Sequence, residues 1–205
     1  MNKLVLDMLP EGLAEGLKPS FDNLPRTSHL DGDFRFRRYS LIDYYGSSTG
    51  KSEFNQSSEY NEYQGDLLRK FEPVEESVLL DKGFRKFYGA FREIGNLYFE
   101  DVGVHQMRIY TESKTVDVSP EGTHQDGFDV VGILGVHRHN VDGGDALAFM
   151  EKSGPSIFSY KLESGEYIIF DDRKLWHSAK PITTIDKTTP GYMDAFILTA
   201  SRDES

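Results

Sequence analysis

From residue 101 onward the sequence consists of short β-type runs separated by turn residues. The runs are rich in aliphatic and aromatic residues, and the pairs Gly143-Gly144, Ser164-Gly165 and Pro190-Gly191 lie between them. Many short strands at this spacing favour an antiparallel sandwich or barrel over βαβ units. The expected strands are residues 104–110, 130–137, 146–150, 157–162, 166–170, 175–179 and 192–200.

The first hundred residues have a different pattern. Residues 34–42 alternate apolar and basic side chains, which predicts a strand. Apolar residues recur every three or four positions from Leu80 to Tyr98, which predicts a helix packed on the core, and a shorter helix is expected at 66–71. The polar segment 44–65 is typical of a surface loop and is a candidate lid.

These patterns predict one α+β domain over residues 1–205. Residues 1–100 would form helices and loops that support a barrel and contribute walls to its pocket, and residues 101–205 would form the β-barrel core. Hydrophobic residues make up 38% of the chain, which is enough for a packed core.

Charge and cysteine content exclude several kinds of function. The chain has 34 acidic and 23 basic residues, and a net charge of −11 argues against a nucleic-acid partner. It has no run of about 18 apolar residues that could span a membrane and no signal-peptide core, so a cytoplasmic location is expected. Cysteine is absent, so a metal site would have to use His, Asp or Glu.

Three side chains from two distant stretches could form such a site. His124 and Asp126 lie two residues apart, so in an extended segment they point to the same side, and His177 on a later apolar strand could be the third ligand. Two imidazoles and one carboxylate leave one face of a metal open, which suits Fe(II) that must bind a co-substrate and dioxygen. Two alternatives remain: these residues form a hydrogen-bonded loop pair and a core histidine, or His137 and His139 form a rival metal pair.

Longer motifs surround these residues. They are Pro120-Glu121-Gly122-x-His124-x-Asp126-Gly127, Arg138-x-Asn140-Val141-x-Gly143-Gly144, Asp171-Asp172-x-Lys174-x-x-His177 and Tyr192-x-Asp194. In these motifs residues 104–200 resemble the 2-oxoglutarate/Fe(II) dioxygenase family that includes bacterial L-isoleucine 4-hydroxylases. The resemblance implies a double-stranded β-helix, that is, a cupin-like jelly-roll barrel, preceded and supported by N-terminal helices.

The resemblance also implies an activity. A member of this family would hydroxylate an aliphatic carbon of a small substrate, typically a free L-amino acid or a derivative, with Fe(II), 2-oxoglutarate and O2. By the same resemblance His124, Asp126 and His177 are the iron ligands. Arg138 would help to bind 2-oxoglutarate and Asn140 the substrate, unless both only organise the turn before Gly143-Gly144.

One position departs from the family. Relatives usually carry an arginine on the last strand that pairs with the distal carboxylate of 2-oxoglutarate, and this chain has Met193 there. Methionine cannot neutralise a carboxylate, so another group is needed. We expect Arg108 to serve, with Tyr110 on the same strand face, although a surface role for Arg108 remains open.

Met193 also favours a second interpretation. The chain would then be a cupin-like metal-binding barrel of another class, either an oxygenase that does not use 2-oxoglutarate or a sensor or binding module. The expected partner in either case is a small molecule, with no nucleic acid and no membrane. The sequence leaves the oligomeric state open, a homodimer included.

Overall fold

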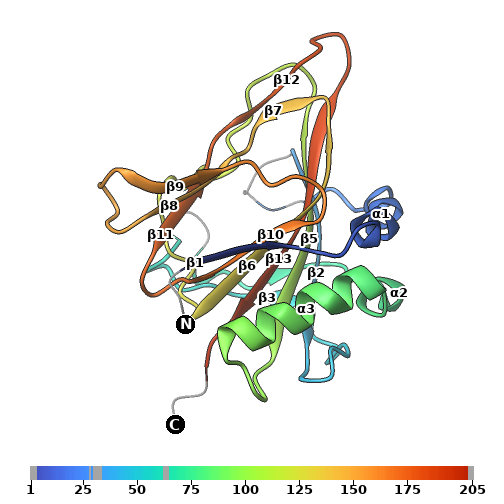
Figure 1. Cartoon of the computed structure of the whole chain (residues 1–205), viewed down its shortest axis with the longest axis vertical. Coiled ribbons are helices and arrows are strands. Elements are labelled where there is room, and N and C mark those ends of the chain that lie inside the picture. Colours follow the sequence, from blue (N-terminus) through green and yellow to red (C-terminus); the bar gives the residue numbers. More distant parts are fainter. Residues whose placement is uncertain (1–3, 28, 30–33, 62–64, 203–205) are drawn as a thin grey trace.

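The computed structural model describes residues 4–27, 29, 34–61 and 65–202. Helices lie on one side of a large sheet, and short strands lie on its other side (Figure 1). The helices are α1 (Leu13–Leu17), the 3-10 helix η1 (Lys18–Phe21), α2 (Glu76–Leu79) and α3 (Lys82–Gly95). The strands are β1 (Leu4–Met8), β2 (Arg35–Ile42), β3 (Glu53–Phe54), β4 (Arg69–Lys70), β5 (Val102–Thr111), β6 (Val130–His139), β7 (Val141–Gly143), β8 (Ala146–Phe149), β9 (Ser156–Tyr160), β10 (Glu166–Asp171), β11 (Trp176–Ala179), β12 (Ile182–Thr184) and β13 (Gly191–Ala200).

The large sheet is antiparallel and has the strand order β1-β10-β6-β13-β5-β2. The smaller sheets have the orders β11-β8-β9, β12-β7 and β3-β4. Two isolated bridges, Val116↔Ile182 and His124↔His177, attach the segment between β5 and β6 to β12 and β11. The chain thus passes repeatedly between the large sheet and the smaller strands.

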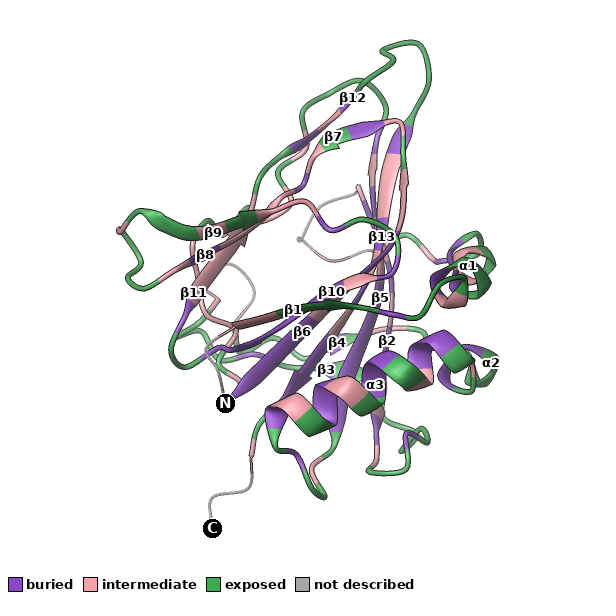
Figure 2. Ribbon diagram, in the orientation of Figure 1, coloured by how far each residue is buried: buried purple, intermediate pink, exposed green. Residues whose placement is uncertain are grey.

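The central strand β13 shows how the large sheet separates two environments. Phe196 and Leu198 are fully buried in the cluster beneath the helices, whereas Met193, Ala195 and Ile197 line a cavity on the other side. This is the two-residue alternation of a strand with both faces covered. The strands at the centre of the sheet are accordingly mostly buried (Figure 2).

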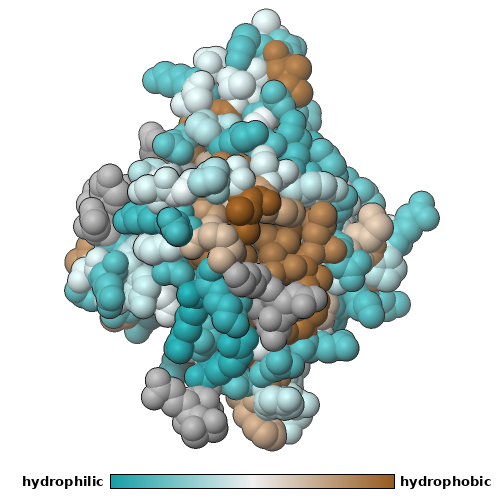
Figure 3. Space-filling model, turned by 60° about the vertical axis from the view of Figure 1, so that its left-hand side comes forward, coloured by the Kyte–Doolittle hydropathy of each residue, from teal (hydrophilic) through white to brown (hydrophobic). Residues whose placement is uncertain are grey.

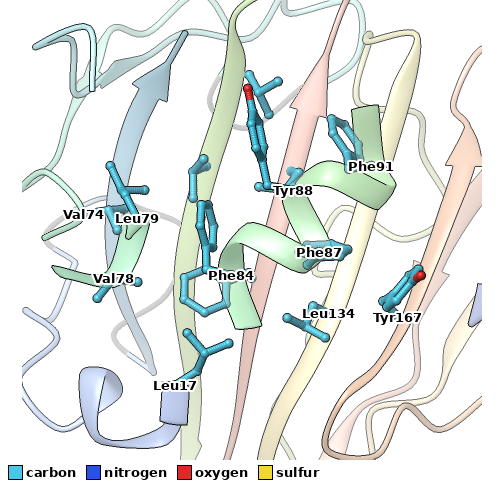
Figure 4. Packing of buried hydrophobic residues seen from close by; sticks show 14 of the residues in the cluster. Leu17, Val74, Val78, Leu79, Phe84, Phe87, Tyr88, Phe91, Leu134 and Tyr167 are labelled. Atoms are coloured by element: carbon cyan, nitrogen blue, oxygen red, sulfur yellow. The ribbon is translucent and has the colours of Figure 1, made fainter. Parts of the chain in front are cut away.

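Helix α3 covers the sheet because its apolar residues recur at helical spacing. Phe84, Phe87 and Phe91 are fully buried on the face toward β6 and β10 (Figure 4). Asp81 caps the N-terminus of the helix, and its carboxylate accepts hydrogen bonds from the backbone N–H of Gly83 and Phe84. At Gly132 of β6 a Cβ atom would lie 2.7 Å from the Phe91 ring, so glycine is what permits this close packing.

Most of the expected elements are present. All seven strands expected after residue 101 occur, as does the strand at 34–42 and the long helix. The short helix expected at 66–71 is wrong, because residues 69–70 form β4. Leu80 and Tyr98, at the ends of the apolar stripe, are exposed because α3 begins after the first and ends before the second.

One face of the molecule is largely polar (Figure 3). Figure 3 shows a face on which hydrophilic side chains surround one central apolar area. Within the described part of the chain, no helix has the length and apolar character needed to cross a bilayer.

The packing of α3 gives a first prediction. Replacing Phe87 with alanine should lower the free energy of unfolding by about 3–5 kcal/mol, because a fully buried ring is removed and a cavity remains. Urea denaturation followed by circular dichroism measures this. Phe99, which is 80% exposed, is the matched control, and its change to alanine should cost no more than about 0.5 kcal/mol. Equal effects of the two substitutions would contradict this packing of Phe87.

Candidate metal centre

His124, Asp126 and His177 converge although the chain places them far apart. The backbone N–H of His124 donates to the carbonyl of His177 at 2.9 Å, and the N–H of His177 donates to the carbonyl of His124 at 2.8 Å. This bridge fixes the two segments side by side. His124 Nε2 lies 3.4 Å from Asp126 Oδ1, and His177 Nε2 lies 3.6 Å from Asp126 Oδ2. One ligand atom from each residue falls within 4.8 Å of the others, so the group could hold a metal ion.

Both imidazoles are oriented by contacts at Nδ1. His124 Nδ1 lies 2.9 Å from the carbonyl oxygen of Gly122, and because a carbonyl can only accept, this nitrogen carries a proton. His177 Nδ1 lies 3.3 Å from Asp172 Oδ1. The Nε2 atoms of both rings are thereby turned toward Asp126, which is the arrangement that supporting residues give to metal-bound histidines.

Asp172 also holds the segment that carries Asp126. Its Oδ2 accepts hydrogen bonds from the backbone N–H of Asp126 and Gly127, each at 2.9 Å, and from that of Phe128 at 3.3 Å. On the other side Gln56 Nε2 donates to the Asp126 carbonyl at 3.0 Å and to its Oδ1 at 3.3 Å. Asp126 is therefore positioned from two directions.

The electrostatics of the group match a cation site. Burial alone would raise the pKa of the Asp126 carboxyl, but hydrogen bonds from His124 and His177 outweigh it and hold that pKa well below its usual range. Burial would lower the pKa of His177, yet Asp126 and Asp172 raise it to about 10. The two carboxylates thus favour a positive charge at this point.

A cavity of about 430 Å³ opens beside the group, within the usual size of small-molecule sites. The odd-numbered residues of β5 and β13 form its floor, and Phe54, Gln56 and Asn61 from the polar segment 44–65 form part of its wall. The described part of that segment therefore contributes to the cavity, while residues 62–64 lie outside the described residues. Three arginines of the first seventy residues also line it, namely Arg35, Arg37 and Arg69.

The structure contradicts the expected role of Arg108 and Tyr110. Cavity-lining residues of β5 are odd-numbered, so both side chains point to the other face of the sheet. Arg108 donates to both carboxylate oxygens of Asp194, at 2.7 and 2.8 Å, and stacks over Tyr192. Tyr110 packs edge-on against Phe36. Strand alternation correctly grouped these residues but could not tell which face was inside.

The side chains of Arg138 and Asn140 form hydrogen bonds with the backbone of nearby turns. Arg138 Nη2 donates to the carbonyl of Gly143 at 2.6 Å. Arg138 is the strand partner of Met193, but only Met193 lines the cavity. Asn140 Nδ2 donates to the carbonyls of Asp186, Thr189 and Pro190, and its Oδ1 accepts from the N–H of Asp186. These contacts favour the alternative in which the motif organises the chain before β7 and β13.

The rival pair His137 and His139 lies around Tyr192, with ring centroids 5.5 and 5.1 Å from that ring. Neither belongs to the group that could hold a metal within the described residues. The structure thus favours His124, Asp126 and His177 over this pair.

Sequence reasoning missed several contributors. Asp172 lies five residues before His177 in the sequence, but its contact with the imidazole was visible only in the fold. Arg35 and Arg37 belong to the predicted strand 34–42, where an apolar and basic alternation normally places the basic face in water. Here that face lines the cavity and both arginines are buried. Gln56 gave no signal beyond its place in a polar segment.

Comparison with known proteins shows to which family the chain belongs. Residues 18–199 match the sequence profile of the 2OG-Fe dioxygenase family. The chain belongs to this family. Members of the 2OG-Fe dioxygenase family use Fe(II), 2-oxoglutarate and O2, and this favours the dioxygenase interpretation over a barrel of another class.

Individual relatives agree with the assignment. The chain is 27% identical over 188 residues to an L-isoleucine-4-hydroxylase of Bacillus thuringiensis, covering 85% of this chain and 78% of that protein. The crystal structure of a bsmA homolog from Methylobium petroleophilum PM1 superposes with a TM-score of 0.82 at 24% identity, covering 95% of this chain and 83% of that one. The crystal structure of IDO from Bacillus thuringiensis gives 0.79 at 20% identity, covering 98% and 95%. The two crystal structures share the fold.

The residues present fit the cofactors of the 2OG-Fe dioxygenase family in part. Two imidazoles and a carboxylate, oriented by Gly122 and Asp172, are a donor set that suits ferrous iron. Arginines that line the cavity could meet the carboxylates of 2-oxoglutarate. Met193 cannot, so a cationic partner in this 2OG-Fe dioxygenase would have to come from elsewhere in the chain.

The orientation of His177 gives a second prediction. In the variant Asp172→Asn one carboxylate oxygen becomes an NH2 group, which can only donate. That group would oppose either His177 Nδ1–H or the backbone N–H groups of residues 126–128, and all of these are donors as well. Ferrous affinity should fall about 10- to 100-fold, as measured anaerobically by competition with a chromophoric chelator. Asp171→Asn is the control, because the Asp171 carboxylate pairs with Lys174 at 3.1 Å instead. Native affinity in Asp172→Asn would contradict this orienting role.

Proposed function

We propose that this protein is an Fe(II)- and 2-oxoglutarate-dependent hydroxylase that acts on an aliphatic carbon of a small carboxylate-bearing substrate, a free L-amino acid or a derivative. The observation that carries the proposal is the convergence of His124, Asp126 and His177 beside a cavity of about 430 Å³. The name of the Bacillus thuringiensis relative supports the substrate class.

In this proposal His124, Asp126 and His177 hold the iron. Bound iron and 2-oxoglutarate would supply the oxidising power, since O2, 2-oxoglutarate and a C–H bond give succinate, carbon dioxide and an alcohol. The protein contributes position and shielding. Asp172 and Gly122 orient the imidazoles, and Gln56 fixes Asp126 from the wall formed by segment 44–65.

One wall of the cavity is suited to an anionic substrate. Arg37 and Arg69 place their guanidinium groups over the ring of Phe54, at 5.5 and 4.9 Å from its centroid. Phe54 also stacks on Phe128, two residues from Asp126, so this wall adjoins the candidate metal ligands. Arg37 Nε donates to His105 Nδ1 at 3.2 Å, and burial together with Arg37 holds the pKa of His105 well below its usual range. A substrate carboxylate would find two cations and a neutral imidazole here.

The fold proposal is a double-stranded β-helix formed by one domain. Two features support it: the chain alternates between the large sheet and the smaller strands, and the bridges Val116↔Ile182 and His124↔His177 join residues 116–124 to β12 and β11. The N-terminal helices would support the barrel from outside. The cytoplasmic location expected from the sequence belongs to the same proposal.

Met193 is the observation that favours the second candidate, a metal-binding barrel that does not use 2-oxoglutarate. The two candidates differ in one measurable property. Only the first predicts that succinate is formed from 2-oxoglutarate when a substrate is present.

The activity is therefore tested by succinate release. The purified protein, supplied with Fe(II), ascorbate, 2-oxoglutarate and a panel of L-amino acids, should release succinate with at least one of them, and mass spectrometry should find a product 16 Da heavier. His124→Ala should lower this release to background, because one iron ligand is lost. Absence of substrate-dependent succinate across the panel would count against the proposal.

The substrate wall gives a separate prediction. Arg69→Met should raise the KM of the amino-acid substrate about 10- to 100-fold with a small change in kcat, because a cation that binds the substrate carboxylate is removed. Lys70→Met is the matched control, since the neighbouring Lys70 on β4 is exposed and pairs with Glu53 at 2.8 Å. An unchanged KM in Arg69→Met would exclude this wall as the carboxylate site.

A further inference from the structure

One end of the cavity is apolar where an anionic co-substrate would need a cation. Met107 and Ile109 of β5, Met193 of β13 and Val118 line this end and pack in one cluster. His105 of β5 lines the same cavity as His124 and Asp126, and the Cα atom of Ile109, four residues further along the strand, lies about 13 Å from that of His105. A carboxylate placed among these apolar side chains without a partner would be costly.

The register of the sheet shows where a partner can come from. Met193 pairs with Ile109, and Ile109 pairs with Arg35 of the next strand, so the three residues form a row across β13, β5 and β2. All three line the cavity. Two strand spacings separate the Cα atoms of Met193 and Arg35 by about 10 Å, a distance that an arginine side chain lying over Ile109 can largely cover.

Arg35 is held at this end of the cavity. Its side chain is buried, with the residue only 8% exposed, and Nη2 donates to the carbonyl of Val118 at 2.8 Å. The guanidinium also lies over the ring of Phe34, 5.3 Å from its centroid. A guanidinium has five N–H donors in a planar fork, a geometry that matches the two oxygens of a carboxylate.

Other arginines near the row are less well placed. Arg138 pairs with Met193 from β6, but it donates to Gly143 and does not line the cavity. Arg37, two residues along β2, is engaged with His105 and lies over Phe71 at 4.6 Å. Arg108 is on the other face of the sheet.

From this placement we infer that Arg35 binds the distal carboxylate of 2-oxoglutarate, in the role that an arginine at position 193 would otherwise have. The inference rests on the proposed function, because it requires 2-oxoglutarate to be the co-substrate. It assigns Arg35 to the co-substrate and leaves Arg37 and Arg69 to the substrate. In this chain the cation would thus lie on β2, in the same row as position 193 of β13 and two strands away from it.

The test measures binding, not turnover. The anaerobic protein loaded with Fe(II) is titrated with 2-oxoglutarate and, separately, with 2-oxopentanoate, which has a methyl group in place of the distal carboxylate. Charge-transfer absorption and calorimetry report both affinities. The native protein should bind 2-oxoglutarate on the order of 100-fold more tightly than 2-oxopentanoate. Arg35→Met should abolish this preference and leave the affinity for 2-oxopentanoate unchanged, which also shows that the variant is folded.

Two further variants sharpen the result. Combining Arg35→Met with Met193→Arg should restore most of the preference, because the cation returns to the same row. Arg38→Met is the matched control: Arg38 lies on the same strand but contacts Pro73 and Glu72 outside the cavity, so the preference should persist. Retention of the preference in Arg35→Met, or its loss in Arg138→Met alone, would overturn the assignment of Arg35. Absence of 2-oxoglutarate binding to the iron-loaded native protein would instead overturn the proposed function itself.

Discussion

The carboxylate of Asp172 is the interaction on which the candidate metal centre depends. One oxygen accepts three backbone N–H groups from residues 126–128, and the other faces His177 Nδ1. It therefore joins the loop that carries Asp126 to the strand that carries His177. Because three backbone N–H groups compensate one of its oxygens for the loss of water, Asp172 can hold both partners while remaining almost fully buried. The backbone bridge between His124 and His177 completes the alignment.

The cavity combines this acidic centre with a basic wall. Asp126 and Asp172 favour a cation at the metal position, as the raised pKa of His177 indicates. Arg35, Arg37 and Arg69 favour anions elsewhere in the same space. Opposite charges in a cavity of low polarity can orient a ligand that carries both a metal-binding group and a carboxylate, because each end is stabilised at only one place. The net charge of the whole chain, −11, gave no indication of this local reversal.

Local pattern was sufficient to predict most of the strands and to select the candidate metal ligands. The strands at residues 130–139 and 191–200 are long and bounded by turn residues, so periodicity found them, whereas β3 and β4 have two residues each and exist only because they pair with each other. The pair His124 and Asp126 was visible because both lie in one extended segment. Arg108 was misplaced because alternation defines two faces of a strand, and both faces of β5 are covered. Only the position of β5 in the folded sheet, between β2 and β13, shows which of its faces lines the cavity.

The same pairing explains why methionine is compatible with position 193. A Cβ atom at Gly144, which has a φ of +71°, would lie 2.8 Å from Met193 Sδ, so the methionine side chain already fills the corner beside the turn after β7. A second guanidinium there would stand in the same row as Arg35, across Ile109. Two like charges at one apolar end of a cavity repel strongly and cost desolvation energy when they share a single carboxylate. An arginine on β2 therefore makes an apolar residue on β13 the better neighbour.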